Sequence, residues 1–184
     1  MSTPMTPVGH SLMGLAIGWV VVPAEFSQRA KIVTLAAFVA LANAPDWPLP
    51  GWGHDRYDVS HSIFLTLGMI AVVAAIATAA LRRTRYFAWR LIVGGAIAWL
   101  SHLLLDTLYF GRRGLAMFWP VSEARVSLPL PWFTVMQLKP LVSAHNARVF
   151  AIEAAFYGAI LALVVIARWL WTRSARATSC ESAD

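Results

Sequence analysis

One stretch of the sequence, residues 63–81, contains no charged side chain and consists mostly of alanine, valine, isoleucine and leucine. As a helix it would rise about 28 Å, close to the thickness of the hydrocarbon core of a bilayer. The rest of the chain has little charge with which to cover a water-facing surface, because only 13% of the 184 residues are charged and 59% are hydrophobic. Soluble domains carry about a quarter charged residues. The sequence therefore predicts an integral membrane protein rather than a disordered, collagen-like or coiled-coil chain.

Four further apolar stretches accompany this run, and together they predict an all-α bundle of about five transmembrane helices. The predicted spans cover residues 8–23, 30–44, 62–81, 89–110 and 148–171. The first two are short for a bilayer and would need tilt or local thinning to cross it. We expect a single transmembrane domain over residues 1–172, followed by a polar tail over residues 173–184.

A long connection, residues 111–147, separates the fourth and fifth predicted spans. It mixes prolines with aromatic residues, as in FWP at 118–120 and LPLPWF at 128–133. This composition is compatible with a segment folded over a site as a lid. It is equally compatible with an aromatic belt that anchors the protein at the membrane surface.

Basic residues predict the orientation of the spans. They are more numerous in the short connections and tail on one side of the bundle, which carry Arg29, Lys31, Arg82, Arg83, Arg85, Arg90, Arg168, Arg173 and Arg176. By the positive-inside rule, that side and the C-terminus are cytoplasmic, and the long loop is external. The net charge of +6 then reflects these loops. The sequence contains no basic stripe with interleaved aromatic residues, which is the pattern that would indicate a nucleic-acid partner. The single cysteine, Cys180, excludes a disulfide within the chain.

Ionisable side chains are scarce, and a group of them lies at one end of the predicted spans. Each such group costs several kcal/mol inside a membrane helix, so each needs a reason to be there. In an up-and-down topology the group falls on the external side and comprises His10, Asp46, His61, His102, Asp106 and Glu153.

The segment SHLLLD at residues 101–106 is the strongest single motif. His102 and Asp106 are four residues apart, so they share one helical face and can reach the same ion. The alternative is a plain histidine–aspartate hydrogen bond inside the bundle. Three histidines and three carboxylates at one depth favour a divalent metal, with zinc the preferred ion and manganese or iron as alternatives.

The other members of the group also have simpler explanations. His10 could be an interfacial residue at a helix start, and Asp46 could serve only the turn in APDWP. Glu153 could be a buried acid paired with Arg148 or Arg56. Four loop residues on the same side are more typical of solvated surface than of ligands, namely His54, Asp55, Asp58 and His145. Arg112 and Arg113 could clamp an anionic substrate or be ordinary flanking charges.

The order of these motifs is similar to that of a known family. Gly9-His10, Pro45-Asp46, Ser60-His61-Ser62 and SHLLLD, followed by FWP, resemble the YdjM-like family of membrane-bound metal-dependent hydrolases over about residues 8–120. The resemblance implies a multi-helix bacterial inner-membrane protein with a metal site and hydrolytic activity. Carried over by position, the implied metal-site residues are His10, Asp46, His61, His102 and Asp106.

The chain departs from the family pattern at two positions. Pro48 stands where the second aspartate of Pro-Asp-x-Asp would be, and Arg56 stands where the first histidine of His-Arg-Gly-x-Thr-His-Ser would be. His54 or Asp58 would have to substitute for that histidine. If the family site holds two ions, this chain is expected either to hold one or to be a diverged member with altered activity.

These observations predict a hydrolase in which a metal-activated water attacks an ester or phosphoester. Glu153, or Asp46 where it is not a ligand, would accept the proton of that water. A site at headgroup depth favours a lipid or lipid-linked substrate, and the oligomeric state stays open. Two alternatives remain, a metal or proton carrier and a purely structural membrane protein. The cluster lies away from the midplane, which disfavours a carrier, and six ionisable groups are a costly way to tie helices together.

Overall fold

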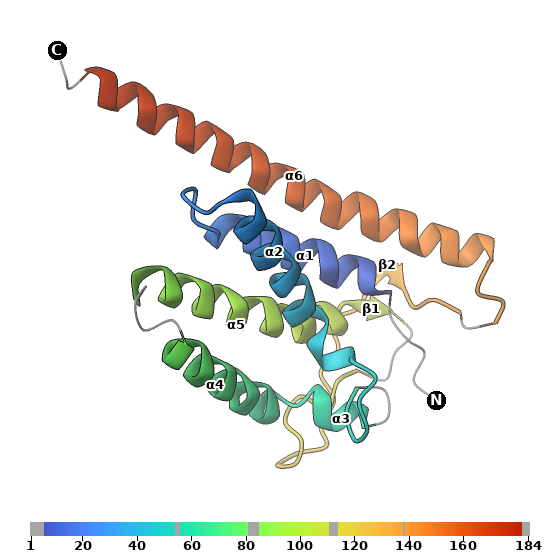
Figure 1. Cartoon of the computed structure of the whole chain (residues 1–184). Helices are drawn as coiled ribbons and strands as arrows, with labels where there is room; N and C mark the ends of the chain where they lie inside the picture. Colours follow the sequence, from blue (N-terminus) through green and yellow to red (C-terminus); the bar gives the residue numbers. More distant parts are fainter. Residues whose placement is uncertain (1–5, 54–55, 81–84, 111–113, 138, 182–184) are drawn as a thin grey trace.

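The computed structural model describes residues 6–53, 56–80, 85–110, 114–137 and 139–181, and these residues are mostly helical (Figure 1). The elements follow in the order α1 (Pro7–Val21), α2 (Gln28–Asn43), the 3-10 helix η1 (Ala44–Asp46), α3 (Tyr57–Ser60), α4 (Ile63–Ala80), α5 (Arg85–Thr107), β1 (Tyr109–Phe110), β2 (Leu130–Thr134) and α6 (Ala144–Glu181). The helical prediction is therefore confirmed for the bulk of the described residues.

Fewer of the described helices qualify as membrane spans by length and hydropathy than the five that the sequence predicts. Among the described residues, two segments are long and apolar enough to cross a membrane by length and composition, Ala88–Thr107 in α5 and Ala144–Ser174 in α6. Pro7–Val21 and Ile63–Ala79 are apolar but shorter. The structure thus supports a mostly helical protein with two candidate spans. Helix α6 also continues to Glu181, so the predicted tail after residue 172 begins as a continuation of the helix.

Local sequence explains where the helices begin and end. Pro7 occupies the first turn of α1, where a missing N–H costs no helical hydrogen bond. The hydroxyl of Ser27 caps α2 by accepting a hydrogen bond from the amide of Ala30 at 3.2 Å. Pro45 follows the end of α2 and sets up the short η1 helix, which ends on Asp46. This turn brings an acidic side chain to the end of the bundle.

Small residues allow the central helices to approach one another closely. A Cβ atom built on Gly14 of α1 would lie 2.7 Å from the carbonyl oxygen of Phe38 in α2. A Cβ atom on Gly94 of α5 would lie 2.9 Å from Val21. Close backbone approach at small residues is a common way to pack helices in membranes. Helix α1 consequently packs against α2, α5 and α6.

The loop after α5 adds a small parallel sheet that the all-α prediction lacks. Strand β1 pairs with β2, and Leu115 forms an isolated antiparallel bridge with Val126. The amide of Leu128 donates to the carbonyl of Thr107 at 2.8 Å, and the amide of Leu130 donates to the carbonyl of Leu108 at 2.8 Å. The last carbonyls of a helix have no partner within the helix, so the returning loop satisfies them.

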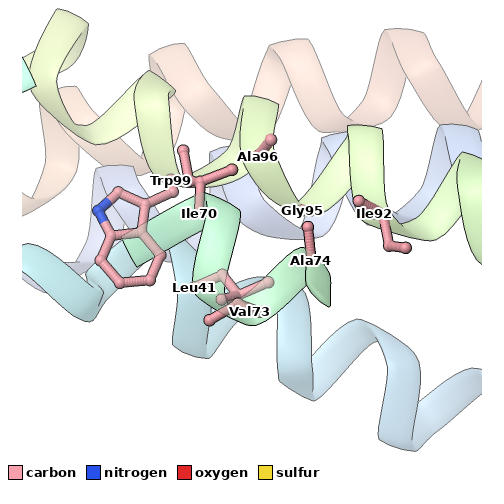
Figure 2. A pocket seen from close by; sticks show the side chains of 8 residues that line it. All are labelled: Leu41, Ile70, Val73, Ala74, Ile92, Gly95, Ala96 and Trp99. Carbon is pink, nitrogen blue, oxygen red and sulfur yellow. The ribbon is translucent and has the colours of Figure 1, made fainter. Parts of the chain in front are cut away.

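Helix α4 lies at the edge of the bundle against α5 (Figure 1). Between α4, α5 and α2 lies an apolar crevice of about 30 Å³, into which Leu41, Ile70 and Trp99 point (Figure 2). Other large apolar side chains of α4 face outward, including Phe64, Val72 and Ile76. An apolar face of this extent is not typical of a water-facing surface.

The arrangement of α1, α5 and α6 determines what meets at each end of the bundle. Helix α1 lies between α5 and α6, and α5 runs in the opposite direction to the other two (Figure 1). The starts of α1 and α6 therefore meet the end of α5. The short helices η1 and α3 pack at that same end.

Candidate metal centre

Five of the predicted site residues come together at this end of the bundle. His10 lies in the first turn of α1, and Asp46 ends η1. His61 directly follows α3, while His102 and Asp106 lie in the last turns of α5. The three histidines and Asp106 are buried, and the side chain of Asp46 is 18% exposed.

Asp106 contacts all three histidines. Its Oδ1 lies 3.3 Å from Nε2 of His10, and its Oδ2 lies 3.2 Å from Nε2 of His61. His102, one helical turn earlier on α5, places its Nε2 3.8 Å from Oδ1 of Asp106. The spacing of four residues therefore brings the imidazole and the carboxylate to the same point, as predicted.

Asp46 closes the cluster from the opposite side. Its Oδ1 lies 3.4 Å from Nε2 of His61, and its Oδ2 lies 3.7 Å from Nε2 of His102. The Nε2 atoms of His61 and His102 are themselves 3.2 Å apart. Nitrogen and oxygen donors from four separate segments thus surround one small volume.

The outer nitrogens of two imidazoles are held by backbone carbonyls. Nδ1 of His102 donates to the carbonyl oxygen of Ala42 at 2.8 Å. Nδ1 of His61 donates to the carbonyl oxygen of Tyr57 at 3.1 Å and also lies 2.8 Å from Oγ of Ser60. A hydrogen bond at Nδ1 fixes the ring and aims Nε2 inward, which is the usual arrangement behind a metal-ligating histidine.

The residues present fit a divalent metal ion. Nδ1 of His10 is buried and has no hydrogen-bond partner among the described residues, which is costly for a polar group without another partner. Ligand atoms around a tetrahedral ion with bonds of about 2.0–2.1 Å lie about 3.3 Å from one another. The nearest pairs of histidine Nε2 and carboxylate oxygen atoms in the cluster, and the Nε2 pair of His61 and His102, are 3.2–3.4 Å apart. Two overlapping sets, His10/Asp46/His102 and His61/His102/Asp106, have all their donor atoms within 4.8 Å. Because both sets contain His102, one shared ion suits them best.

The cluster also has a characteristic charge distribution. Burial alone would lower the pKa of His61, but hydrogen bonds with Asp106 and Asp46 outweigh it and raise the pKa to about 9. Burial would raise the pKa of Asp46, but the hydrogen bond with His61 and the nearby charge of His102 lower it. At neutral pH the metal-free cluster therefore holds a protonated His61 between two carboxylates.

Tyr57 completes the cluster and was not predicted from the sequence. Its hydroxyl donates to Oδ2 of Asp106 at 2.5 Å. Its ring stacks on the imidazole of His61, with the ring centroids 3.8 Å apart. The one available signal was its position four residues before His61, which puts both on one side of a helical turn.

Glu153 is buried beside the cluster rather than within it. Its Oε2 accepts a hydrogen bond from the amide of Gly9 at 3.0 Å and another from the hydroxyl of Thr6. These contacts replace the pairing with Arg148 or Arg56 that the sequence left open. Because Gly9 immediately precedes His10, the carboxylate is held next to the first histidine of the cluster.

The remaining predicted candidates do not join the cluster. The side chain of Asp58 is 43% exposed and pairs with Arg125 at 3.3 Å, so it does not substitute for the absent family histidine. His145 lies in the first turn of α6 with its Nε2 3.0 Å from the carbonyl oxygen of Val135. Four more candidates lie outside the described residues, namely His54, Asp55, Arg112 and Arg113.

Comparison with known proteins identifies a family. A family model described as YdjM inner membrane protein matches residues 5–178. No curated protein and no solved structure matches the chain significantly. The match extends well beyond residue 120, where the recognisable motifs end, and includes α6 with Glu153.

Metal affinity should depend steeply on pH. Because His61 is protonated below about pH 9 in the metal-free cluster, binding must displace that proton. We expect the apparent affinity for zinc to rise about tenfold per pH unit from pH 6.5 to about 9 and then to level off. Competition titrations with a chelating dye at several pH values would measure this. An affinity independent of pH over this range would contradict the assignment.

Proposed function

We propose that this chain, which belongs to the YdjM inner membrane protein family, is a membrane-bound metal-dependent hydrolase. The observation that carries the proposal is the convergence of His10, Asp46, His61, His102 and Asp106 on one buried volume. These five side chains would hold a single divalent ion, and their nitrogen and oxygen donors favour zinc, with manganese or iron as alternatives.

A divalent ion held by these residues would activate a water molecule and polarise the oxygen of an ester or phosphoester. The protein contributes the fixed orientation of the imidazoles through Ala42 and Tyr57. It also excludes water from most of the site, because the histidines and Asp106 are buried. Asp46 is the partly exposed member, so the substrate would approach from its side.

Glu153 is the proposed proton acceptor. The contacts to Gly9 and Thr6 hold its Oε2, while its buried Oε1 has no hydrogen-bond partner among the described residues. A carboxylate with one oxygen held and the other available is suited to take a proton from an activated water. Asp46 would take this role if it does not ligate the ion.

The proposed substrate is a lipid or lipid-linked ester or phosphoester. The loop after α5 lies close to the cluster, since the hydroxyl of Ser62 donates to the carbonyl of Trp119 at 2.5 Å and Ser62 adjoins His61. A polar pocket of about 190 Å³ lies between this loop and α3, lined by Asp58, Ala116, Trp119, Glu123 and Arg125. A polar pocket beside apolar helices suits a substrate with a headgroup and acyl chains.

In the membrane, α1, α2, α4, α5 and α6 are the proposed spans. Outward-facing apolar side chains such as Ile32 on α2, Ile76 on α4 and Leu163 on α6 support this arrangement. The distribution of arginine and lysine supports an external metal cluster and a cytoplasmic C-terminus.

A reporter fused after Asp184 tests this topology. Alkaline phosphatase should be inactive in that fusion, and green fluorescent protein should be fluorescent, because both readouts would be on the cytoplasmic side. An active phosphatase fusion would reverse the proposed orientation.

Substitution of Glu153 tests the proposed reaction. We expect the metal-loaded protein to hydrolyse at least one member of a panel of phospholipids and lipid-linked phosphoesters. Glu153→Gln should lower kcat by about 100-fold or more, the usual contribution of a general base, with the metal content unchanged. The matched control is Glu25→Gln, which removes an acid that belongs to neither the cluster nor the polar pocket. A metal-loaded protein without activity on the whole panel, or a Glu153→Gln variant with wild-type kcat, would contradict the proposal.

A further inference from the structure

We infer that the opposite end of the bundle carries a binding site for the phosphate-bearing headgroup of an anionic phospholipid. A pocket of about 520 Å³ lies there between the end of α1, the first turns of α5 and the later turns of α6. Its lining includes Val22, Glu25, Arg90, Arg168 and Trp171. This volume is within the usual range for small-molecule sites.

The pocket is separate from the metal cluster. Val22 lies 12 residues after His10 along α1, and Arg90 lies 12 residues before His102 along α5. At 1.5 Å per residue, the two sites are about 18 Å apart along the helix axes. The pocket therefore shares no residue with the proposed hydrolase site.

Arg168 is held in place by the end of α1. Its guanidinium donates to the carbonyl oxygen of Val22 at 2.6 Å and to that of Trp19, and it lies 5.8 Å from the ring centroid of Trp19. Carbonyls at a helix C-terminus lack partners within the helix and carry partial negative charge. A guanidinium has five N–H donors, so these two contacts leave donors for a ligand.

The pocket has an excess of positive charge. Arg90 and Arg168 are near enough for their charges to repel each other, and Glu25 is close enough to offset part of this repulsion. The described residues of the lining thus include two cations and one carboxylate. A phosphate diester bound between the two guanidinium groups would compensate the remaining charge through charge-assisted hydrogen bonds.

The rest of the lining favours a lipid over a free anion. Val20, Val164 and Ala167 provide an apolar wall, and the side chain of Trp171 is 78% exposed. Acyl chains could lie along this wall while the headgroup contacts the arginines. Inorganic phosphate has no acyl chain and would gain no binding free energy from this apolar wall. Basic pockets between helices on the cytoplasmic side of membranes are known to take anionic lipid headgroups.

Lipid binding to the purified full-length chain in a neutral detergent tests the inference. Native mass spectrometry would follow titration with phosphatidylglycerol, phosphatidylcholine or inorganic phosphate. We expect saturable binding of one phosphatidylglycerol, and at least fivefold weaker binding of phosphatidylcholine and of inorganic phosphate. Equal binding of phosphatidylcholine would overturn the proposal, and phosphate binding as tight as the lipid would indicate a site for free anions instead.

Arg90→Gln is the informative variant, because Arg168→Gln would also remove the contacts to α1. We expect it to weaken phosphatidylglycerol binding about fivefold, the usual effect of one basic residue near an anionic headgroup. The matched control is Arg173→Gln, which removes the same charge from α6 at a position outside the pocket lining. The Cζ atom of Arg173 lies 3.7 Å from the ring centroid of Trp169. Equal weakening by both variants, or none by Arg90→Gln, would overturn the proposal.

Discussion

The buried carboxylate of Asp106 is the constraint on which this structure depends. A carboxylate removed from water costs several kcal/mol unless partners compensate it. Here three partners come from two other segments, because His10 lies on α1, Tyr57 begins α3 and His61 directly follows α3. Compensating this one group requires α1, α3 and α5 to meet at one end of the bundle.

The two ends of the bundle have opposite chemical character. The end with the cluster gathers acids and histidines whose charges need mutual compensation or a metal ion. At the other end, Arg168 satisfies carbonyls of α1 and shares a pocket with Arg90. Apolar side chains between the two ends face outward on α4 and α6. Such a difference between the two ends is expected of a membrane protein whose ends lie on opposite sides of the bilayer.

Two features of the sequence made the site residues recognisable, namely the rarity of ionisable side chains and the spacing of His102 and Asp106. These two residues are four apart on one helix. Because ionisable residues are rare in this chain, their occurrence at one end of the predicted spans indicated that they lie together. Tyr57 was missed because tyrosine is not costly near a membrane surface. The setting of Glu153 was missed because one of its partners is the backbone of Gly9, which leaves no trace in side-chain patterns. The β1–β2 pair was also missed, because the loop is held there by backbone hydrogen bonds to carbonyls at the end of α5.

Hydropathy located the helices but did not establish five membrane spans, because α1, α2 and α4 are short.

Metal content tests the central claim most directly. Full-length protein purified in detergent, incubated with excess zinc and dialysed, would be measured by inductively coupled plasma mass spectrometry. The structure predicts about one equivalent of metal in the wild type, less than a tenth of an equivalent in His102→Ala, and an unchanged content in His145→Ala, which alters a histidine outside the cluster. Less than a tenth of an equivalent in the wild type, or equal content in His102→Ala, would contradict the account.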